Sequence, residues 1–140
     1  MSNTELVKSI FATMGSMVAD ANKIKECIKS HAETGRTQDL AQMELISSEL
    51  VGLFERISEK AGENELRMSR LGIEGNSQYQ KLVAMLPDGP TRQAFSDKVQ
   101  ELELSINQAR EMMLERETVM ASQLAILKGV VGEMQLEINV

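Results

Sequence analysis

The stretch VKSIFATMGSMVADANKIKECIKSH, residues 7–31, decides the fold of this chain. Its apolar residues return at alternating steps of three and four, the heptad spacing of a helix that packs lengthwise on another helix. The pattern predicts a helix over residues 4–33, with Thr4 as its N-cap and Gly35 in the break that follows. The positions on this apolar face are Val7, Ile10, Met14, Met17, Ala21, Ile24, Ile28 and His31.

The same spacing continues in a second segment, for which we predict a helix over residues 38–71 with Thr37 as its N-cap. The sequence LGIEGN, residues 71–76, ends it, because Gly72 and Gly75 readily adopt left-handed backbone. A short helix is predicted over residues 77–86, followed by the strong turn signal PDGP at residues 87–90. The apolar positions of the second helix are Met43, Ile46, Leu50, Leu53 and Ile57, with Ala61 and Met68 beyond them.

A third long helix is predicted over residues 91–138, where no proline interrupts the helical period. Its apolar face changes register after Met120, as in a coiled-coil stutter. The predicted fold is therefore all-α: one domain, residues 1–140, built as an antiparallel helical bundle or coiled coil of three main helices and a short connecting helix. The apolar positions are Phe95, Val99, Leu102, Ile106, Ala109 and Met113, then Leu124, Leu127, Val131, Met134 and Ile138.

The three predicted helices differ in length. The first two have about 30 residues each, or roughly 45 Å, whereas the third has about 47 residues and roughly 70 Å. Because short connections favour antiparallel neighbours, we expect the third helix to run beside the second and to extend past the hairpin loop from near Gln123. The apolar stripe beyond that point then needs a partner, another copy of the chain, or a fold-back at Gly129 or Gly132.

Composition narrows the functional class. The 140 residues are 42% hydrophobic and 26% charged, and their net charge of −6 disfavours nucleic-acid binding, which needs clustered Lys and Arg. The single cysteine, Cys27, and the start MSNTELVKSI, which lacks a signal-peptide pattern, lead us to expect a cytoplasmic protein. The longest uncharged run near the C-terminus, TVMASQLAIL at residues 118–127, falls short of the roughly 20 apolar residues of a membrane span, so no membrane insertion is expected.

Residues that could carry catalysis are few. His31, the only histidine, lies in SHAETG and faintly resembles a phosphotransfer histidine, but the favoured interpretation is a polar residue closing the heptad face at a helix C-terminus. Lysines near Cys27 could lower its thiol pKa, although no catalytic partner is evident. Glu111 and Glu115 share a helix face but lack the histidines of a di-iron site, so a solvated face is expected. We predict no catalytic, metal or cofactor site, and no enzyme.

The methionines point to helix-on-helix binding. Ten are present, and Met112, Met113, Met120 and Met134 fall in the C-terminal part. Their flexible thioethers suit surfaces that repack around varied amphipathic helices. An ordinary core helix, or the interface of a homodimer, explains the same apolar stripe and remains the alternative at this point.

Two segments give a family resemblance. ELISSELVGLFERISEKAGENELRMSRLG, residues 44–72, looks like the Leu-rich helix of the FlgN family of bacterial flagellar export chaperones. INQAREMMLERETVMASQLAILKG, residues 106–129, looks like that family's final helix, from Asn107 to a Leu-x-x-Leu-x-Gly-like end at Leu124, Leu127 and Gly129. The similarity spans residues 38–132 and consists of Leu spacings and helix lengths, without the tryptophan that some members carry.

The resemblance implies a small cytoplasmic chaperone for type III export. It would bind the amphipathic C-terminal helices of hook-associated flagellar proteins, prevent their premature assembly and deliver them to the export gate. No gate-docking residue is identifiable. The alternative is a coiled-coil stalk component or homo-oligomeric spacer of a secretion apparatus. The client-binding residues expected on this basis are Met113, Met120, Leu124, Leu127, Val131 and Met134.

Overall fold

The computed structural model describes residues 2–37, 39–115 and 129. These residues are helical in the main and contain no strand, as predicted. They form four helices, α1 (Asn3–Thr37), α2 (Leu40–Arg70), α3 (Gln78–Met85) and α4 (Pro90–Leu114). The predicted all-α fold is confirmed, and the helix packing is consistent with a bundle.

The helix ends differ in detail from the predicted ones. Ser2, rather than Thr4, caps α1, because its hydroxyl accepts a 3.2 Å hydrogen bond from the Glu5 N–H. The helix passes through Gly35 to Thr37, which a single glycine near a helix end permits at a cost of about 1 kcal/mol relative to alanine. Asp39, rather than Thr37, caps α2, since its carboxylate accepts from the Gln42 N–H at 3.1 Å.

The C-terminus of α2 follows its predicted glycine signal. Gly72 has φ +78°, and its N–H donates to the Ser69 carbonyl at 3.0 Å. The Ile73 N–H donates to the Met68 carbonyl at 2.9 Å, which completes a Schellman motif. Ile73 and Met68 are both buried, so this turn is fixed by apolar packing as well as by hydrogen bonds.

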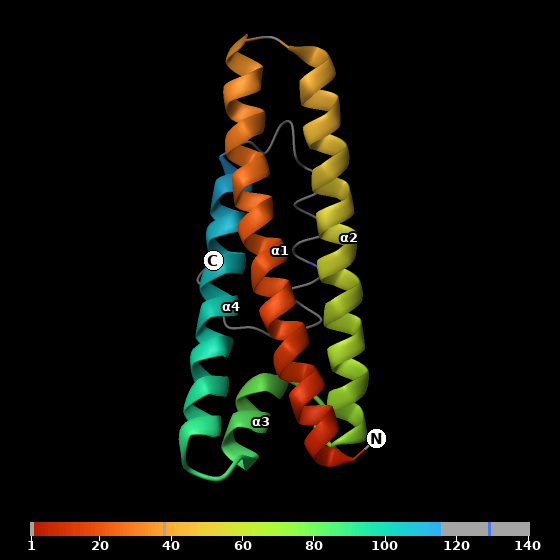
Figure 1. The fold of residues 1–140 in the computed structure, drawn as a ribbon, viewed down its shortest axis with the longest axis vertical. Helices are drawn as coiled ribbons and strands as arrows, with labels where there is room; N and C mark the ends of the chain where they lie inside the picture. The colour runs from red at the N-terminus through yellow and green to blue at the C-terminus, as the bar shows by residue number, and fades with distance from the viewer. Residues whose placement is uncertain (1, 38, 116–128, 130–140) are drawn as a thin grey trace.

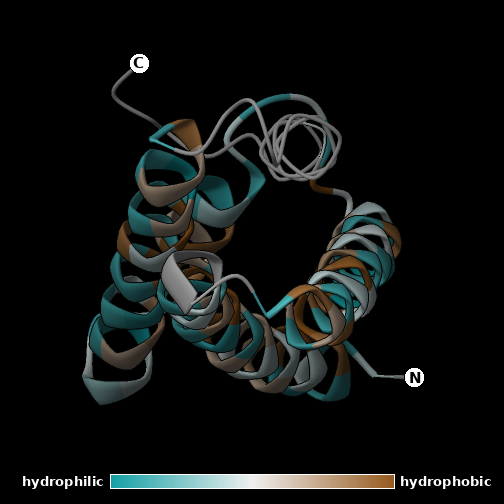
Figure 2. Cartoon of the chain, turned by 90° about the horizontal axis from the view of Figure 1, so that it is seen from above, coloured by the Kyte–Doolittle hydropathy of each residue, from teal (hydrophilic) through white to brown (hydrophobic). Residues whose placement is uncertain are grey.

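The long helices are arranged around α1. Figure 1 shows α1 between α2 and α4, and the view from above in Figure 2 agrees. The main interhelix packing is accordingly α1 with α2 and α1 with α4, while α3 packs on α4. The chain therefore turns back antiparallel to α2 as predicted, but α4 lies beside α1 rather than beside α2, because the connecting segment with α3 carries it across the lower end of the bundle (Figure 1).

The predicted apolar faces form the core. All of the predicted heptad positions of α1 are buried except Val7, which is half-buried, and the six predicted positions of α4 are all buried. One hydrophobic cluster joins residues from α1, α2, α3 and α4. Its largest side chains with less than 2% exposure include Phe54, Phe95, Ile10, Leu53, Leu102 and Ile106.

The third predicted helix is described only in part. Its described section, α4, ends at Leu114 with Glu115 as the C-cap, whereas the prediction ran from 91 to 138. Residues 116–128 and 130–140 lie outside the described residues, and with them the predicted change of register after Met120 and the expected overhang from Gln123.

Candidate functional site

The predicted client-binding set divides at the end of α4. Met113 is fully buried and belongs to the hydrophobic core, so in this conformation it has no surface with which to contact a client. Met120, Leu124, Leu127, Val131 and Met134 lie outside the described residues. Their role remains a prediction.

The upper end of the bundle consists of the α1–α2 hairpin alone, as far as the described residues go. The Lys25 ammonium donates to the Gln108 side-chain carbonyl at 2.7 Å, and Lys29 and Glu115 line one cleft. Residues 30–37 of α1 therefore rise beyond the described end of α4, which Figure 1 also shows. A stretch of helical hairpin is thus left without α4 beside it.

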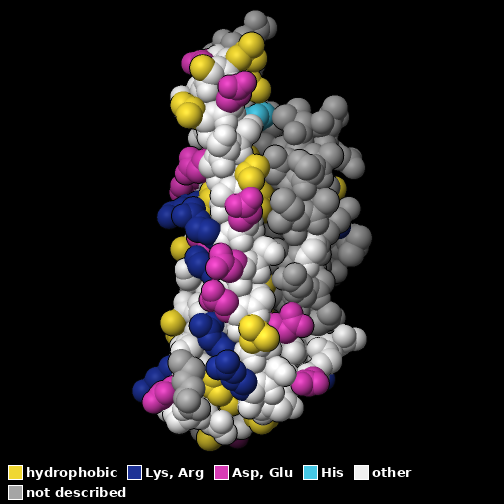
Figure 3. All heavy atoms as spheres, turned by 90° about the vertical axis from the view of Figure 1, so that its right-hand side faces the viewer, with side chains coloured by type: hydrophobic (Ala, Val, Ile, Leu, Met, Phe, Trp, Pro, Cys, Tyr) yellow, Lys and Arg dark blue, Asp and Glu magenta, His cyan; other side chains and the backbone are white. Residues whose placement is uncertain are grey.

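Two large apolar side chains are exposed on this hairpin end. Leu40 is 73% exposed and Leu45 is 65% exposed, both in the first two turns of α2, and Met43 between them is half-buried. Figure 3 shows hydrophobic side chains gathered with acidic ones toward the top of this face. Single exposed leucines are common, but a group at one end of a helical hairpin is a candidate contact surface for another helix.

A polar cleft of about 590 Å³ lies between the facing side chains of α1 and α4 just below this end. Glu111 and Glu115 line it from α4, and Lys25 and Lys29 line it from α1. Both glutamates are exposed, as their predicted place on a solvated face requires. Among the residues that the structure describes, no group of three or more His, Cys, Asp or Glu side chains could hold a metal ion.

A buried polar cluster joins α1, α2 and α3. The Asn64 Nδ2 donates to the Ile10 carbonyl at 3.3 Å and to the Tyr79 hydroxyl at 3.1 Å. The Arg67 Nη1 donates at 2.9 Å to both the Asn64 side-chain carbonyl and the Thr13 hydroxyl. Burial raises the pKa of Tyr79 to about 12, so its hydroxyl stays protonated and able to donate.

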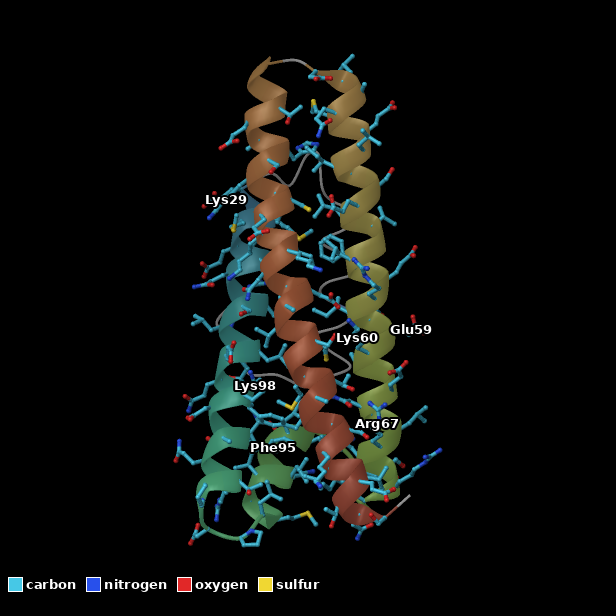
Figure 4. The ribbon with its side chains drawn as sticks, viewed as in Figure 1. Lys29, Glu59, Lys60, Arg67, Phe95 and Lys98 are labelled. Atoms are coloured by element: carbon cyan, nitrogen blue, oxygen red, sulfur yellow. The ribbon has the colours of Figure 1, made fainter. Side chains whose placement is uncertain are left out.

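One ion pair is shielded within the α1–α2 interface. The Lys60 ammonium lies 2.6 Å from the Asp20 carboxylate, whose side chain is only 7% exposed (Figure 4). Together with Asn64, this pair fixes the register of α1 against α2. Any other register would leave a buried charge or a buried amide without its partner. Asp20, Lys60 and Asn64 were not singled out from the sequence.

A sequence signal exists for one of these polar residues. Asn64 stands three residues after Ala61 and four before Met68. It therefore occupies a heptad position that is otherwise apolar, where a polar residue specifies register at a cost in stability. Asp20 directly precedes the heptad position of Ala21 and had no such signal.

His31 lies on the apolar face of the hairpin, as the favoured interpretation required. It is 2% exposed, and α1 continues for six residues after it, so it is not at the helix terminus as expected. A phosphate donor cannot reach an imidazole buried to this degree without opening of the hairpin. The phosphotransfer interpretation gains no support from this position.

The surroundings of Cys27 raise the pKa of its thiol, whereas the lysines nearby in the sequence suggested a lowered pKa. Burial raises the pKa of its thiol, and the Glu49 carboxylate raises it further through its charge and a hydrogen bond with the thiol. The neighbouring lysines therefore do not activate it. The carboxylate comes from α2, across the hairpin, and was not visible in the local sequence of α1.

We expect Cys27 to react slowly with an aromatic disulfide reagent in the folded protein. Because only the thiolate attacks, the rate should still be rising with pH above 9.0, the ordinary pKa of this group. Glu49→Gln should move this profile to lower pH, since it removes a negative charge beside the thiol. The unfolded chain in urea serves as the reference. A folded-state profile with its midpoint below that of the unfolded chain would contradict the assignment.

Of the helices within the described residues, none combines the length and the apolarity that a membrane crossing requires. Comparison of the chain with protein-family models, with curated proteins and with solved structures gave no match. A functional assignment therefore depends on the geometry of the molecule itself. It is a helical bundle with buried polar contacts between α1 and α2 and with exposed leucines at the hairpin end.

Proposed function

We propose that this chain is a cytoplasmic export chaperone. It binds amphipathic C-terminal helices of flagellar hook-associated proteins, prevents their premature assembly and delivers them to the type III export gate, acting by binding rather than by catalysis. The proposal is supported by the resemblance of residues 38–132 to the FlgN family. It is also compatible with the helical bundle, which is the kind of scaffold on which helix-to-helix binding is built.

The observation that carries the proposal is the exposed hairpin end. Leu40 and Leu45 are 73% and 65% exposed beyond the described end of α4. Leu40 and Leu45 are five residues apart and project in different directions from α2. An amphipathic client helix that covered Leu45 would gain about 1.5–3 kcal/mol from burying it fully. The predicted set from Met120 to Met134 follows α4 in the chain and lies outside the described residues, so the exposed leucines are the described part of the proposed surface.

The first test is removal of residues 123–140. We expect the truncated protein to keep its α1–α2 hairpin, because the described core is formed by residues before 115, and to lose capture of a purified hook-associated protein. Circular dichroism reports the helices, and pull-down reports capture. Full capture by the folded, truncated chain would show that the C-terminal set is not the binding site.

A matched pair of substitutions tests the hairpin end in the same assay. Leu45→Glu should weaken binding of a hook-associated C-terminal helix at least tenfold, whereas Leu66→Glu on the same helix should leave it within twofold. Leu45 and Leu66 are 65% and 66% exposed, so the two changes are equal in chemistry and exposure and differ in position. Equal affinities in the two variants would remove Leu45 from the contact.

The second candidate is a coiled-coil stalk component or homo-oligomeric spacer of a secretion apparatus. The same exposed leucines favour it, because two hairpin ends could cover each other. Sedimentation separates the candidates: a tight dimer that is lost in Leu127→Glu supports the spacer, whereas a monomer that binds client supports the chaperone.

A further inference from the structure

An apolar hollow of about 350 Å³ lies at the opposite end of the bundle from the hairpin tip. It is formed where the start of α1 meets the start of α4. Its walls are Val7, Phe11, Pro90, Ala94 and Phe95, with Lys8 at one side. Figure 4 shows Phe95 and Lys98 in this lower part of the molecule.

Two aromatic rings form the floor of the hollow. Phe11 and Phe95 pack at a tilt of 55° with their ring centroids 5.4 Å apart, and Phe95 is 1% exposed while Phe11 is half-buried. The whole chain has three phenylalanines, so two of the three stand at this one surface depression. Buried aromatic floors of this kind anchor partner side chains in protein interfaces.

The walls of the hollow are rigid and small. Pro90 fixes the backbone at the first position of α4, and Ala94, one turn later, is exposed and leaves open space that a larger residue would fill. The hollow is therefore preformed on two packed helices, so a ligand would order few groups of this chain when it binds.

A single positive side chain lines the hollow, although the chain as a whole has a net charge of −6. Lys8 is the one charged residue of the lining, and within the described part of the chain its ammonium has no ion-pair partner. Lys98 lies over the Phe11 ring, 5.9 Å from the centroid, and also pairs with Glu101 at 3.0 Å. The first turn of α4 contains no acidic residue.

We propose that this hollow docks an acidic amphipathic helix of a partner protein. One bulky apolar side chain of that helix enters between Phe11 and Ala94, and a carboxylate one turn away pairs with Lys8. The positive side chain beside an apolar floor is complementary to that combination and unfavourable for a basic helix. Leu40 and Leu45 of the hairpin tip lie at the other end of the bundle, and this docking does not depend on the client binding proposed above.

The experiment titrates the full chain with two model peptides. One is a capped amphipathic helix with Leu and Phe along one face and Glu along its flanks; the other has Lys in place of each Glu. We expect the Glu peptide to bind saturably by calorimetry and to shift the backbone amide resonances of Phe11, Ala94 and Phe95. The Lys peptide should bind at least tenfold more weakly.

Matched variants locate the binding. Ala94→Trp fills the hollow and should abolish binding, whereas Ala19→Trp, at an exposed alanine of α1, should not change it. Lys8→Glu should weaken binding at least fivefold, and Lys23→Glu should leave it within twofold; circular dichroism confirms that each variant is folded. Equal affinity for both peptides, shifts confined to the hairpin end, or unchanged binding in Ala94→Trp would overturn the proposal.

Discussion

Phe54→Ala is expected to lower the free energy of unfolding by about 3–5 kcal/mol, the usual cost of removing a buried phenylalanine ring. Phe54 is fully buried on α2 and is among the largest side chains of the hydrophobic cluster. Its loss removes apolar burial and also leaves a cavity that rigid neighbouring helices can close only in part. For a domain whose total stability is of order 5–15 kcal/mol, this is a large fraction.

Urea unfolding followed by circular dichroism measures the effect, with Leu66→Ala as the control. Leu66 is on the same helix but 66% exposed, so its truncation should change the free energy of unfolding by no more than about 0.5 kcal/mol. If both variants lose the same small amount, the packing of α2 on α1 described above does not hold in solution.

Asn64→Leu is expected to lower the free energy of unfolding by about 2–3 kcal/mol, although leucine is similar in size and more apolar. The substitution removes three hydrogen bonds, to the Ile10 carbonyl, the Tyr79 hydroxyl and the Arg67 guanidinium. Tyr79 is buried, so its hydroxyl would lose a donor without gaining water, at a cost of about 1–3 kcal/mol.

A double-mutant cycle with Tyr79→Phe isolates this contact. Tyr79→Phe alone should cost about 1 kcal/mol, because Asn64 keeps its other partners. The double variant should lose about 1 kcal/mol less free energy of unfolding than the sum of the losses in the two single variants, since no unpaired hydroxyl remains. Asn76→Leu, at an exposed position, controls for the change of residue type. Strict additivity would mean that Asn64 and Tyr79 do not interact.

The fold was predictable from the sequence because the heptad pattern of α1 and α4 depends on spacing alone. Every predicted apolar position from Phe95 to Met113 is buried, and Gly72 ends α2 by the expected left-handed turn. The caps were less predictable. Ser2 and Thr4, or Thr37 and Asp39, carry equivalent hydroxyl or carboxyl oxygens two residues apart, and only the local backbone selects between them.

The surroundings of individual side chains were not predictable, because they depend on which helix lies opposite. The sequence neighbours of Cys27 are lysines, whereas the group that governs its pKa is Glu49 from α2. Met113 was predicted both as a position of the apolar face and as a client-binding residue, and it is a core residue, since α4 packs on α1. The hollow at Phe11 and Phe95 likewise joins residues more than 80 positions apart.

The position of α1 between α2 and α4 has a consequence for the order of folding. α2 follows α1 across a short connection, so their contacts close shorter loops, such as the 40 positions between Asp20 and Lys60. The hydrogen bonds of Lys25 with Gln108 and of Asn22 with Ser105 join residues 83 positions apart. Closing long loops costs more entropy and slows the formation of the contacts that depend on them. The α1–α2 hairpin is therefore the natural nucleus, and α4 docks on it late, on a hairpin whose register Asp20, Lys60 and Asn64 have already fixed.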